Sequence, residues 1–419
     1  NSLFDMSELA VMGLAEVLPK YFALKRRMDQ TVAEVLAWKP DILITIDSPD
    51  FSLRVARAVR AADPKIRTCH YVAPSVWAWR PGRAGKMAGY IDHVLALLPF
   101  EPPYMEAEGM ACDFVGHPIA AQTPITSKKI AQFQADFNLD PARESLVILP
   151  GSRASEIKRL LPIFCEVLSQ PCFAEFQLIF PTLPHLAPLL QAEIGVLPQD
   201  KRLVTGSGHS AAAAAEERLV AYSAATSALA ASGTVSLELA AAGTPMVIAY
   251  DMGLISRLII GAMLQIDTVT LVNLVSETRA VPEFIGRDCK AAQIAPALRQ
   301  ILSAPAAQAQ AIEETMSRLG RGDPRGVGRR EPLLGHGTAP RTLETPAHPS
   351  TQGRLKAGRL TASPATPLLN PEKGGSYAPS LRPSPFLFNF TKPSDHRSTF
   401  AELDRHNFRR AVKVGDPSG

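Results

Sequence analysis

The chain has 419 residues, of which 46% are hydrophobic and 20% are charged, so it can bury the cores of two or three domains. This composition excludes a fibrous protein and a wholly disordered chain. The net charge of +4 is uneven, because residues 1–320 hold 28 basic and 32 acidic side chains, whereas residues 321–419 hold 16 and 8. The five cysteines form no CxxC or Cys/His cluster, which favours a reducing cytosol over a disulfide framework or a structural zinc site.

The sequence contains no basic segment followed by an apolar stretch, and no apolar run long enough to span a bilayer. We therefore expect a soluble or peripheral protein. The absence of methionine at residue 1 and the abrupt opening indicate a fragment, or a processed form, of a longer protein.

Short apolar runs alternate with helical patterns from residue 41 onward, which predicts βαβ units and mostly parallel sheets. The expected strands are Asp41–Ile46, Arg67–Val72, His93–Leu97, Ser145–Leu149, Gln177–Phe180, Ser227–Ala231 and Met246–Tyr250. The expected helices include Asp50–Ala62, Ser155–Leu168 and Thr234–Ala242. This order predicts an α/β protein with two domains, residues 1–120 and 121–320, joined by the polar stretch 116–127.

Residues 321–419 differ in character, because Gly, Pro, Arg, Ser and Thr dominate and apolar periodicity disappears. This composition predicts a disordered tail. Its basic excess could bind RNA or anionic lipid, but no recognisable module is present, so a solvated coil is favoured and no nucleic-acid partner is expected.

The segment 11–27 mixes apolar residues with a basic cluster. Its apolar members include Leu14, Val17, Leu18 and Phe22, and its basic members are Lys20, Lys25, Arg26 and Arg27. This pattern is typical of a helix lying at the surface of an anionic membrane. An amphipathic helix packed on the sheet is the alternative, and the residues alone favour it.

Two carboxylates follow the first expected strand, at the edge where open parallel sheets bind their ligands. They are Asp47 and Asp50. An Asp47 side chain facing a cleft is well placed to act as a general base. In the alternative interpretation Asp50 caps the next helix and Asp47 is a turn residue.

The end of the next expected strand is dense in polar and aromatic residues, which predicts a cleft lining. These residues are His70, Ser75, Trp77, Trp79 and Arg80. In the alternative, the tryptophans belong to the core. A further histidine, His117 in the sequence GHP, is isolated, and a structural role is favoured over a catalytic one.

A small-residue turn follows the strand Ser145–Leu149 and opens a helix. It contains Gly151, Ser152, Arg153 and Glu156. Backbone amides at a helix N-terminus together with an arginine form an anion site suited to phosphate. The alternative is a tight turn with a surface arginine.

A second turn of this kind contains Ser232, Gly233, Thr234, Ser236 and Glu238. The glycine lets a ligand approach the backbone, the hydroxyls can meet phosphate, and Glu238 can accept hydrogen bonds from ribose. The alternative is a capped helix whose dipole is complemented by Glu238. Two phosphate-type turns in one α/β domain favour a nucleotide site.

Eight motifs occur in the order and at about the intervals of bacterial lipid-A-disaccharide synthases. They are AVMGLAEVLPKY, LITIDSPDF, HYVAPSVWAWR, LLPFE, GHP, LPGSRASEI, ASGTVSLE and VNLVSETRAVPEFIG. The sequence over roughly residues 1–318 therefore resembles that family. The resemblance implies a GT-B fold, with two Rossmann-like domains facing a cleft. It also implies an inverting transfer from UDP-2,3-diacylglucosamine to 2,3-diacylglucosamine 1-phosphate (lipid X), giving the β-1,6 lipid A disaccharide phosphate and UDP, with no metal or other cofactor.

The resemblance also implies residue roles. Asp47 matches an essential aspartate, the candidate base for the acceptor 6-hydroxyl, and Arg153 matches an essential arginine that grips the UDP diphosphate. Gly233, Thr234, Ser236 and Glu238 match the nucleotide-binding turn, and Asn273 matches a donor-site asparagine. The 11–27 region is implied to contact the inner face of the cytoplasmic membrane.

Two departures from the family pattern accompany this resemblance. No GExSGD turn precedes residue 41, and a proline-rich sequence follows Gly320 where the family continues with a Pro-Ser turn and an Ala-rich helix. We therefore expect an N-terminally truncated copy with a tail foreign to the family. An inactive remnant that still binds UDP or membrane is one alternative. Another GT-B enzyme, such as a peptidoglycan N-acetylglucosaminyl transferase or a UDP-sugar epimerase, explains both turns but not SVWAWR or IDSPDF.

Overall fold

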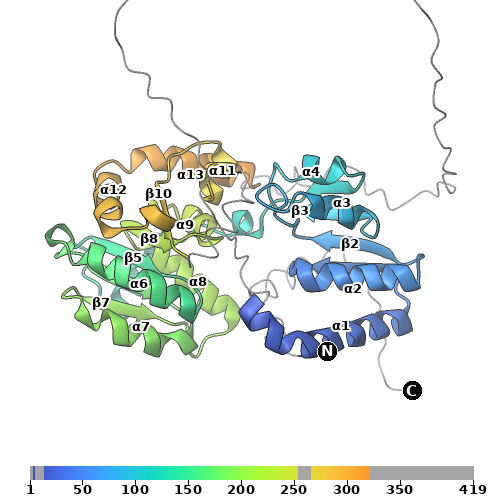
Figure 1. Ribbon diagram of the computed structural model, residues 1–419. Helices are drawn as coiled ribbons and strands as arrows, with labels where there is room; N and C mark the ends of the chain where they lie inside the picture. Colours follow the sequence, from blue (N-terminus) through green and yellow to red (C-terminus); the bar gives the residue numbers. More distant parts are fainter. Residues whose placement is uncertain (1–2, 5–13, 253–265, 321–419) are drawn as a thin grey trace, which may run out of the picture. The chain divides into compact units, whose positions relative to one another are not determined.

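The computed structural model describes residues 3–4, 14–252 and 266–320 (Figure 1). The predicted disordered tail, residues 321–419, lies outside the described residues. The first sheet and its helices comprise α1 (Leu14–Trp38), β1 (Ile42–Ile46), α2 (Pro49–Ala62), β2 (Arg67–Tyr71), α3 (Gly82–Ala88), β3 (His93–Ala96), α4 (Pro102–Glu106) and β4 (Ala111–Phe114).

The first sheet is parallel, with the strand order β1-β2-β3-β4. Ile46 at the end of β1 pairs with Tyr71, and Tyr71 pairs with Leu95 of β3. The carboxyl ends of β1 and β2 therefore lie next to each other. Helices α2 and α3 pack together, because Leu53 of α2 and Met87 of α3 share one buried core cluster.

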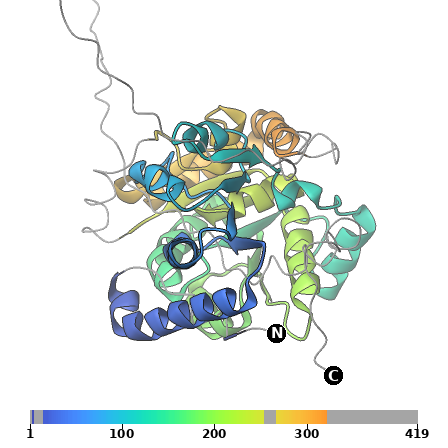
Figure 2. The same ribbon diagram turned by 90° about the vertical axis from the view of Figure 1, so that its right-hand side faces the viewer.

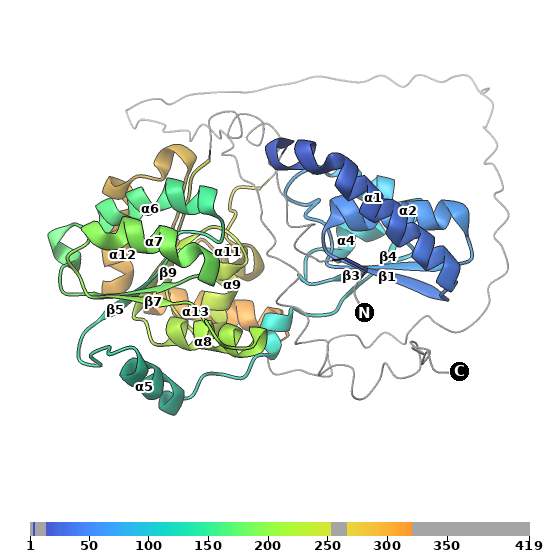
Figure 3. The same cartoon turned by 90° about the horizontal axis from the view of Figure 1, so that it is seen from below.

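Helix α2 has a second apolar stripe that α1 covers. Val55 and Val59 of α2 are buried against Val32 and Leu36 of α1. Figures 1 and 3 show α2 between α1 and the sheet. Figure 2 shows α1, in dark blue, along its length at the surface of this half. The later turns of α1, which follow the segment 11–27, thus pack on α2.

The second sheet follows a short connecting helix, η2 (Pro118–Ala121), and α5 (Ser127–Asp136). Its strands are β5 (Ser145–Leu149), β6 (Gln177–Pro181), β7 (Lys201–Val204), β8 (Ser227–Ala231), β9 (Met246–Tyr250) and β10 (Glu283–Ile285). Its α-helices are α6 (Ala154–Leu168), α7 (Ala187–Glu193), α8 (Ala211–Ser223), α9 (Val235–Ala242), α11 (Leu271–Ser276), α12 (Ala291–Ser303) and α13 (Ala306–Arg318). Short 3-10 helices are η3 (Pro171–Phe173), η4 (Pro184–Leu186), η5 (Ile194–Val196) and η6 (Gly286–Asp288).

The second sheet is also parallel, with the order β10-β9-β8-β5-β6-β7. Every residue of β5, β6, β8 and β9 is buried, as expected for strands covered on both faces. Figure 3 shows α6 and α7 on one side of these strands and α8 and α9 on the other. The short apolar runs that predicted these strands are therefore explained by a sheet that helices cover on both faces.

All seven expected strands are present, and their ends agree to within one residue. Three further strands, β4, β7 and β10, were not expected. They have three or four residues each and are less uniformly buried, so their apolar signal is weak. No helix among the described residues is long and apolar enough to cross a membrane. All five cysteines are described, and each is a free thiol.

Glu101 is a buried carboxylate that ties two loops of the first half together. Its Oε1 accepts a hydrogen bond from the Trp77 indole at 3.2 Å, and its Oε2 accepts from the amides of Leu97 and Leu98 at 3.1 and 3.0 Å. Burial raises the pKa of Glu101 to about 7, although these three hydrogen bonds act in the opposite direction. The carboxylate therefore holds Trp77 in the core at a cost in desolvation.

Replacing Glu101 with Gln should change how stability depends on pH. The folded chain holds the proton more tightly than the unfolded chain, so the contribution of this group is fully present below about pH 4.5 and is lost as the pH rises to about 7. The unfolding free energy of the wild type minus that of E101Q should fall by roughly 2 to 4 kcal/mol over this interval and then level off. Urea unfolding between pH 4 and 8, followed by tryptophan fluorescence, measures this difference.

Glu106→Gln is the matched control, because Glu106 is an exposed glutamate of the adjacent helix α4. Its difference from the wild type should stay nearly constant over the same range. A constant difference for E101Q as well would contradict the raised pKa.

Candidate functional site

Both predicted phosphate turns lie at one edge of the second sheet. β5 pairs with β8, and Leu149 is opposite Ala230. The chain proceeds from β5 to β6 and β7 on one side, then returns to place β8, β9 and β10 on the other. β5 and β8 therefore flank the topological switch point, where open α/β sheets bind their ligands. The turns after these two strands start side by side.

The turn after β5 requires glycine at residue 151. Its φ is +122°, and a Cβ there would lie 2.5 Å from the Cβ of Glu156. The Glu156 carboxylate accepts hydrogen bonds from the Ser152 amide at 3.0 Å and from Nη1 of Arg153 at 2.9 Å. The Tyr250 hydroxyl lies 3.5 Å from the same carboxylate. Glu156 thus orders the turn and holds Arg153 at the N-terminus of α6.

The turn after β8 is also built around a glycine, Gly233, whose φ is +152°. The Ser236 side chain is buried, and its hydroxyl donates to the Gly233 carbonyl at 3.0 Å. Glu238 accepts a hydrogen bond from the Tyr222 hydroxyl at 3.3 Å. Ser232 and Thr234 remain partly exposed at the start of α9. The structure therefore gives Ser236 and Glu238 partners within the protein, and leaves the first residues of the turn at the surface.

Asn273 of α11 is completely buried and clamps the segment 268–281. Its amide nitrogen donates to the Val281 carbonyl at 2.8 Å and to the Thr268 hydroxyl at 3.3 Å, and its amide oxygen accepts from the Val281 amide at 3.0 Å. The amide nitrogen and the amide oxygen of Asn273 therefore both have hydrogen-bond partners within the protein. The side chain shapes the loop that follows the segment 253–265, which lies outside the described residues.

The carboxyl edge of the first sheet is strained. Asp47, Ser48 and Val72 have φ values of 47°, 45° and 77°, which only glycine and, less often, Asn or Asp adopt readily. The Asp47 amide nevertheless donates to the Tyr71 carbonyl at 3.0 Å, and the Val72 amide to the Leu95 carbonyl at 3.0 Å. Strain at adjacent strand ends, fixed by the ladder, is typical of functional sites.

The two carboxylates of this edge differ. Asp47 is 9% exposed, whereas Asp50 is exposed in the first turn of α2 and its Oδ1 accepts from Nη2 of Arg83 at 2.8 Å. The interpretation of Asp50 as the helix cap is wrong, because Ser48 holds the N-cap position. Asp47 is the more enclosed of the two at the end of β1.

The segment 70–80 combines core and surface residues. His70 is fully buried, its Nδ1 lies 2.8 Å from the Thr45 hydroxyl, and burial lowers its pKa to about 4, so it is neutral at pH 7. Trp77 is core, held by Glu101, and Ser75 is buried. Trp79 is partly buried, and the Arg80 guanidinium lies 4.3 Å from its ring centroid. Of the five residues predicted to line a cleft, only Trp79 and Arg80 reach the surface.

His117 has a local structural role. Its Nδ1 accepts a hydrogen bond from the Ile119 amide at 3.1 Å and so caps η2. Its own amide donates to the Leu319 carbonyl at 3.2 Å. These contacts agree with the structural interpretation of this residue.

Of the basic and apolar segment 11–27, residues 14–27 form the start of α1, but the side chains of Leu14, Val17, Leu18 and Lys20 lie outside the described residues. Phe22 is 82% exposed and Tyr21 is 48% exposed. Lys25 pairs with Asp29 at 2.9 Å, Arg26 is exposed, and Arg27 lies over the Phe4 ring. This end of α1 therefore presents aromatic and basic groups to its surroundings.

Two features of the site were not predicted from the sequence. The sequence analysis did not identify Glu101, although it lies in the motif LLPFE. A carboxylate within an apolar segment is the signal that could have indicated a buried glutamate. A basic cavity between α2 and α3, lined by Arg54, Arg57, Arg83 and Lys86 among others, was not predicted either. Among the described residues, no group of three or more His, Cys, Asp or Glu side chains is placed to hold a metal ion.

Comparison with known proteins identifies the family. The family described as lipid-A-disaccharide synthetase matches residues 1–323. Lipid-A-disaccharide synthase of Ruegeria pomeroyi is 55% identical over 324 residues, which are 77% of this chain and 80% of the relative. The synthase of Rhodospirillum centenum is 40% identical over 329 residues, with the same coverage.

Solved structures with the same fold bind UDP or UDP-sugars. S. aureus MnaA in complex with UDP superposes with a TM-score of 0.50 at 12% identity, covering 75% of this chain and 77% of that chain. UDP-GlcNAc 2-epimerase from Neisseria meningitidis, bound to UDP-GlcNAc, gives 0.50 at 15% identity, covering 74% and 80%. These likenesses confirm the predicted α/β fold of the GT-B type. The sequence matches show more: the chain belongs to the lipid-A-disaccharide synthetase family, the glycosyltransferases of lipid A biosynthesis.

Proposed function

We propose that this chain transfers the diacylglucosaminyl group of UDP-2,3-diacylglucosamine to the 6-hydroxyl of 2,3-diacylglucosamine 1-phosphate. The observation that carries the proposal is the pair of glycine turns, with Arg153, at the switch point of the second sheet. We assign residues 121–320 to the UDP-sugar and residues 1–120 to the acceptor and the membrane.

The donor diphosphate is assigned to the turn after β5. There the amides at the N-terminus of α6 and the Arg153 guanidinium meet phosphate oxygens. Glu156 holds Arg153 through an ion pair of 2.9 Å, which orients the arginine at the N-terminus of α6. The turn at Gly233 takes the remaining polar groups of the nucleotide, with Glu238 at the ribose. Asn273 contributes by fixing the loop at 268–281.

Asp47 is assigned as the general base. Its carboxylate takes the proton from the acceptor 6-hydroxyl while that oxygen attacks the anomeric carbon of the donor. The bond from this carbon to the diphosphate oxygen breaks, and UDP leaves with the electron pair from the opposite face, so the configuration inverts. The negative charge that develops on the diphosphate is stabilised by Arg153 and the α6 dipole.

Both substrates carry acyl chains, so the enzyme must meet them at a membrane surface. The exposed Phe22 ring and the neighbouring Lys25 and Arg26 suit this contact, because an aromatic ring inserts at the headgroup level and cations meet anionic lipid. We assign this end of α1 to peripheral contact with the inner face of the cytoplasmic membrane.

Replacement of Asp47 with Asn should abolish transfer and spare the nucleotide site. Asn fits the positive φ of residue 47 but cannot take the proton, and loss of a general base costs about 100-fold or more in kcat. Turnover is measured by the conversion of radiolabelled lipid X and UDP-2,3-diacylglucosamine to disaccharide. The nucleotide site is checked by titration with UDP.

Asp41→Asn is the control, because Asp41 is exposed at the opposite end of β1; it should retain full turnover. Equal turnover in D47N would exclude the base assignment. Turnover with UDP-N-acetylglucosamine instead of the diacylated donor would contradict the proposed substrate.

Replacement of Arg153 with Ala should weaken UDP binding itself by about tenfold or more, because charge-assisted hydrogen bonds to phosphate are lost. Isothermal titration with UDP measures this. Lys158→Ala removes an exposed cation one turn further along α6 and should leave the affinity unchanged. Unchanged UDP affinity in R153A would remove this residue from the donor site.

Replacement of Phe22 with Ser should lower the affinity for vesicles containing phosphatidylglycerol by about tenfold, since burial of a phenylalanine contributes about 1.5–3 kcal/mol. Vesicle co-sedimentation at two salt concentrations measures it. Val196→Ser is the control, because Val196 is 76% exposed on the second half of the chain. Equal loss in both variants would point to a general effect of surface hydrophobicity.

A further inference from the structure

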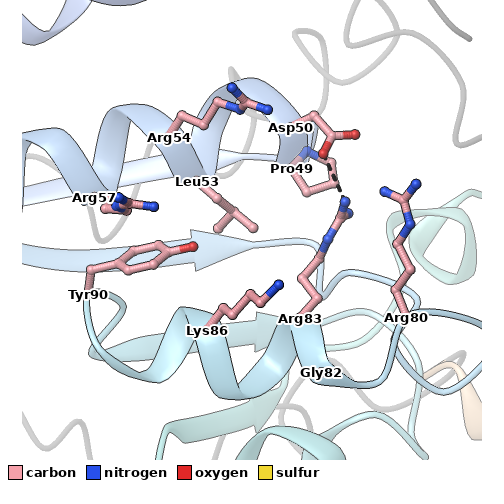
Figure 4. A pocket seen from close by; sticks show the side chains of 10 residues that line it. All are labelled: Pro49, Asp50, Leu53, Arg54, Arg57, Arg80, Gly82, Arg83, Lys86 and Tyr90. Atoms are coloured by element: carbon pink, nitrogen blue, oxygen red, sulfur yellow. Dashed lines mark hydrogen bonds and ion pairs between the residues drawn. The ribbon is translucent and has the colours of Figure 1, made fainter. Parts of the chain in front are cut away.

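A basic cavity lies in the first half of the chain, and its lining begins at Pro49, two residues after Asp47. It has a volume of about 500 Å³ and is bordered by α2 and α3 (Figure 4). Its polar lining comprises five cations, one carboxylate and a phenol: Arg54, Arg57, Arg80, Arg83, Lys86, Asp50 and Tyr90. A cavity of this size accommodates a small ligand.

The cations exceed the anions within this cavity. The Asp50 carboxylate is engaged by Arg83 at 2.8 Å, as Figure 4 shows. In the part of the chain that the structure describes, no ion pair joins Arg54, Arg57 or Lys86 to a carboxylate. Several unneutralised cations around one cavity repel one another, and an anion bound among them removes that repulsion.

The packing of the two helices fixes this arrangement. Leu53 and Ala56 of α2 are buried in one cluster with Ala84 and Met87 of α3. On each helix the cations are three residues apart, Arg54 with Arg57 and Arg83 with Lys86, so each pair shares a face. The like charges are therefore held together by the core beneath them, which makes the site preorganised for an anion.

We propose that this cavity binds the phosphate monoester of the acceptor glycolipid. The inference rests on the proposed function and adds a subsite to it. Pro49 and Asp50, at one end of the cavity, follow Asp47 by two and three residues, and Arg80 ends the loop that begins at the strained Val72. An acceptor whose hydroxyl lies at Asp47 therefore reaches the cavity with its opposite end.

The remaining lining suits a sugar phosphate. Leu53 and Tyr90 give the cavity an apolar wall and a ring against which a pyranose can pack. A phosphate monoester carries nearly two charges at neutral pH, which matches a cluster of several cations better than a singly charged phosphodiester.

A second groove also borders α3 and is mostly apolar. It has a volume of about 290 Å³ and is lined in part by Val76, Ala84, Pro103 and Tyr104. A basic cavity and an apolar groove on the same short helix suit an amphiphile, in which a charged headgroup is joined to acyl chains. This favours a phosphorylated lipid over free phosphate as the occupant.

The test compares two ligands and two double variants of the full chain. The ligands are 2,3-diacylglucosamine 1-phosphate and its dephosphorylated analogue, each in detergent micelles. The pocket variant is R57Q/K86Q, and the matched variant is K65Q/R67Q, whose exposed Lys and Arg lie outside the cavity. Binding is followed by titration calorimetry. The urea unfolding transition, followed by tryptophan fluorescence, serves as the folding control, because Trp38, Trp77 and Trp79 lie in the same half of the chain as the variants.

The wild type should bind the phosphorylated ligand about tenfold or more tightly than its analogue. R57Q/K86Q should lose this preference, with the unfolding transition unchanged, and K65Q/R67Q should keep it. If R57Q/K86Q keeps the preference, the cavity is not the phosphate subsite, and the proposed function stands. If R57Q/K86Q keeps it and loses affinity for phosphatidylglycerol vesicles, the cavity contacts bulk membrane instead. If neither glycolipid binds to the wild type, the proposed function fails together with this inference.

Discussion

The parallel pairing of β5 with β8 is the constraint on which the proposed donor site depends. These two strands are distant in sequence, yet their register places Leu149 opposite Ala230, so the two glycine turns emerge at one edge. Each turn alone is a common strand-to-helix connection. Together, at the point where the strand order reverses, they form a surface with two helix N-termini and one arginine, which is suited to a diphosphate.

The proposed acceptor site depends on a different feature, which is backbone strain maintained by hydrogen bonds. Asp47 and Val72 keep positive φ values while their amides continue the ladder to Tyr71 and Leu95. The strand ends cannot relax without breaking these bonds, so the backbone at Asp47 is held in this conformation. Glu101 acts similarly on the following loop, since from a buried position it accepts one hydrogen bond from Trp77 and two from the amides of Leu97 and Leu98.

The sequence allowed prediction of the fold where patterns are local and strong. Fully buried strands such as β5 and β9 are continuous apolar runs, and their ends were located to within one residue. Short strands such as β7 are only partly buried, so periodicity could not separate them from loops. Ligand binding at the turns of Gly151 and Gly233 was predicted from their residue types, and the structure places both turns at one edge of the sheet. Sequence spacing could not show that the side chains of Ser236 and Asn273 form hydrogen bonds with backbone groups of the protein.

The basic cavity shows why a cluster that is evident in space is invisible in sequence. Arg54 and Arg57 on α2 look like the solvated face of an amphipathic helix, and Arg83 and Lys86 on α3 look the same. In the folded chain Leu53 and Met87 belong to one buried cluster, and the two faces line the same cavity. The cations of the two helices then surround one cavity. Their mutual repulsion costs free energy unless an anion binds there. Both substrates of the proposed reaction carry phosphate, so a chain that handles them needs cations on each half, and this cavity supplies those on the first.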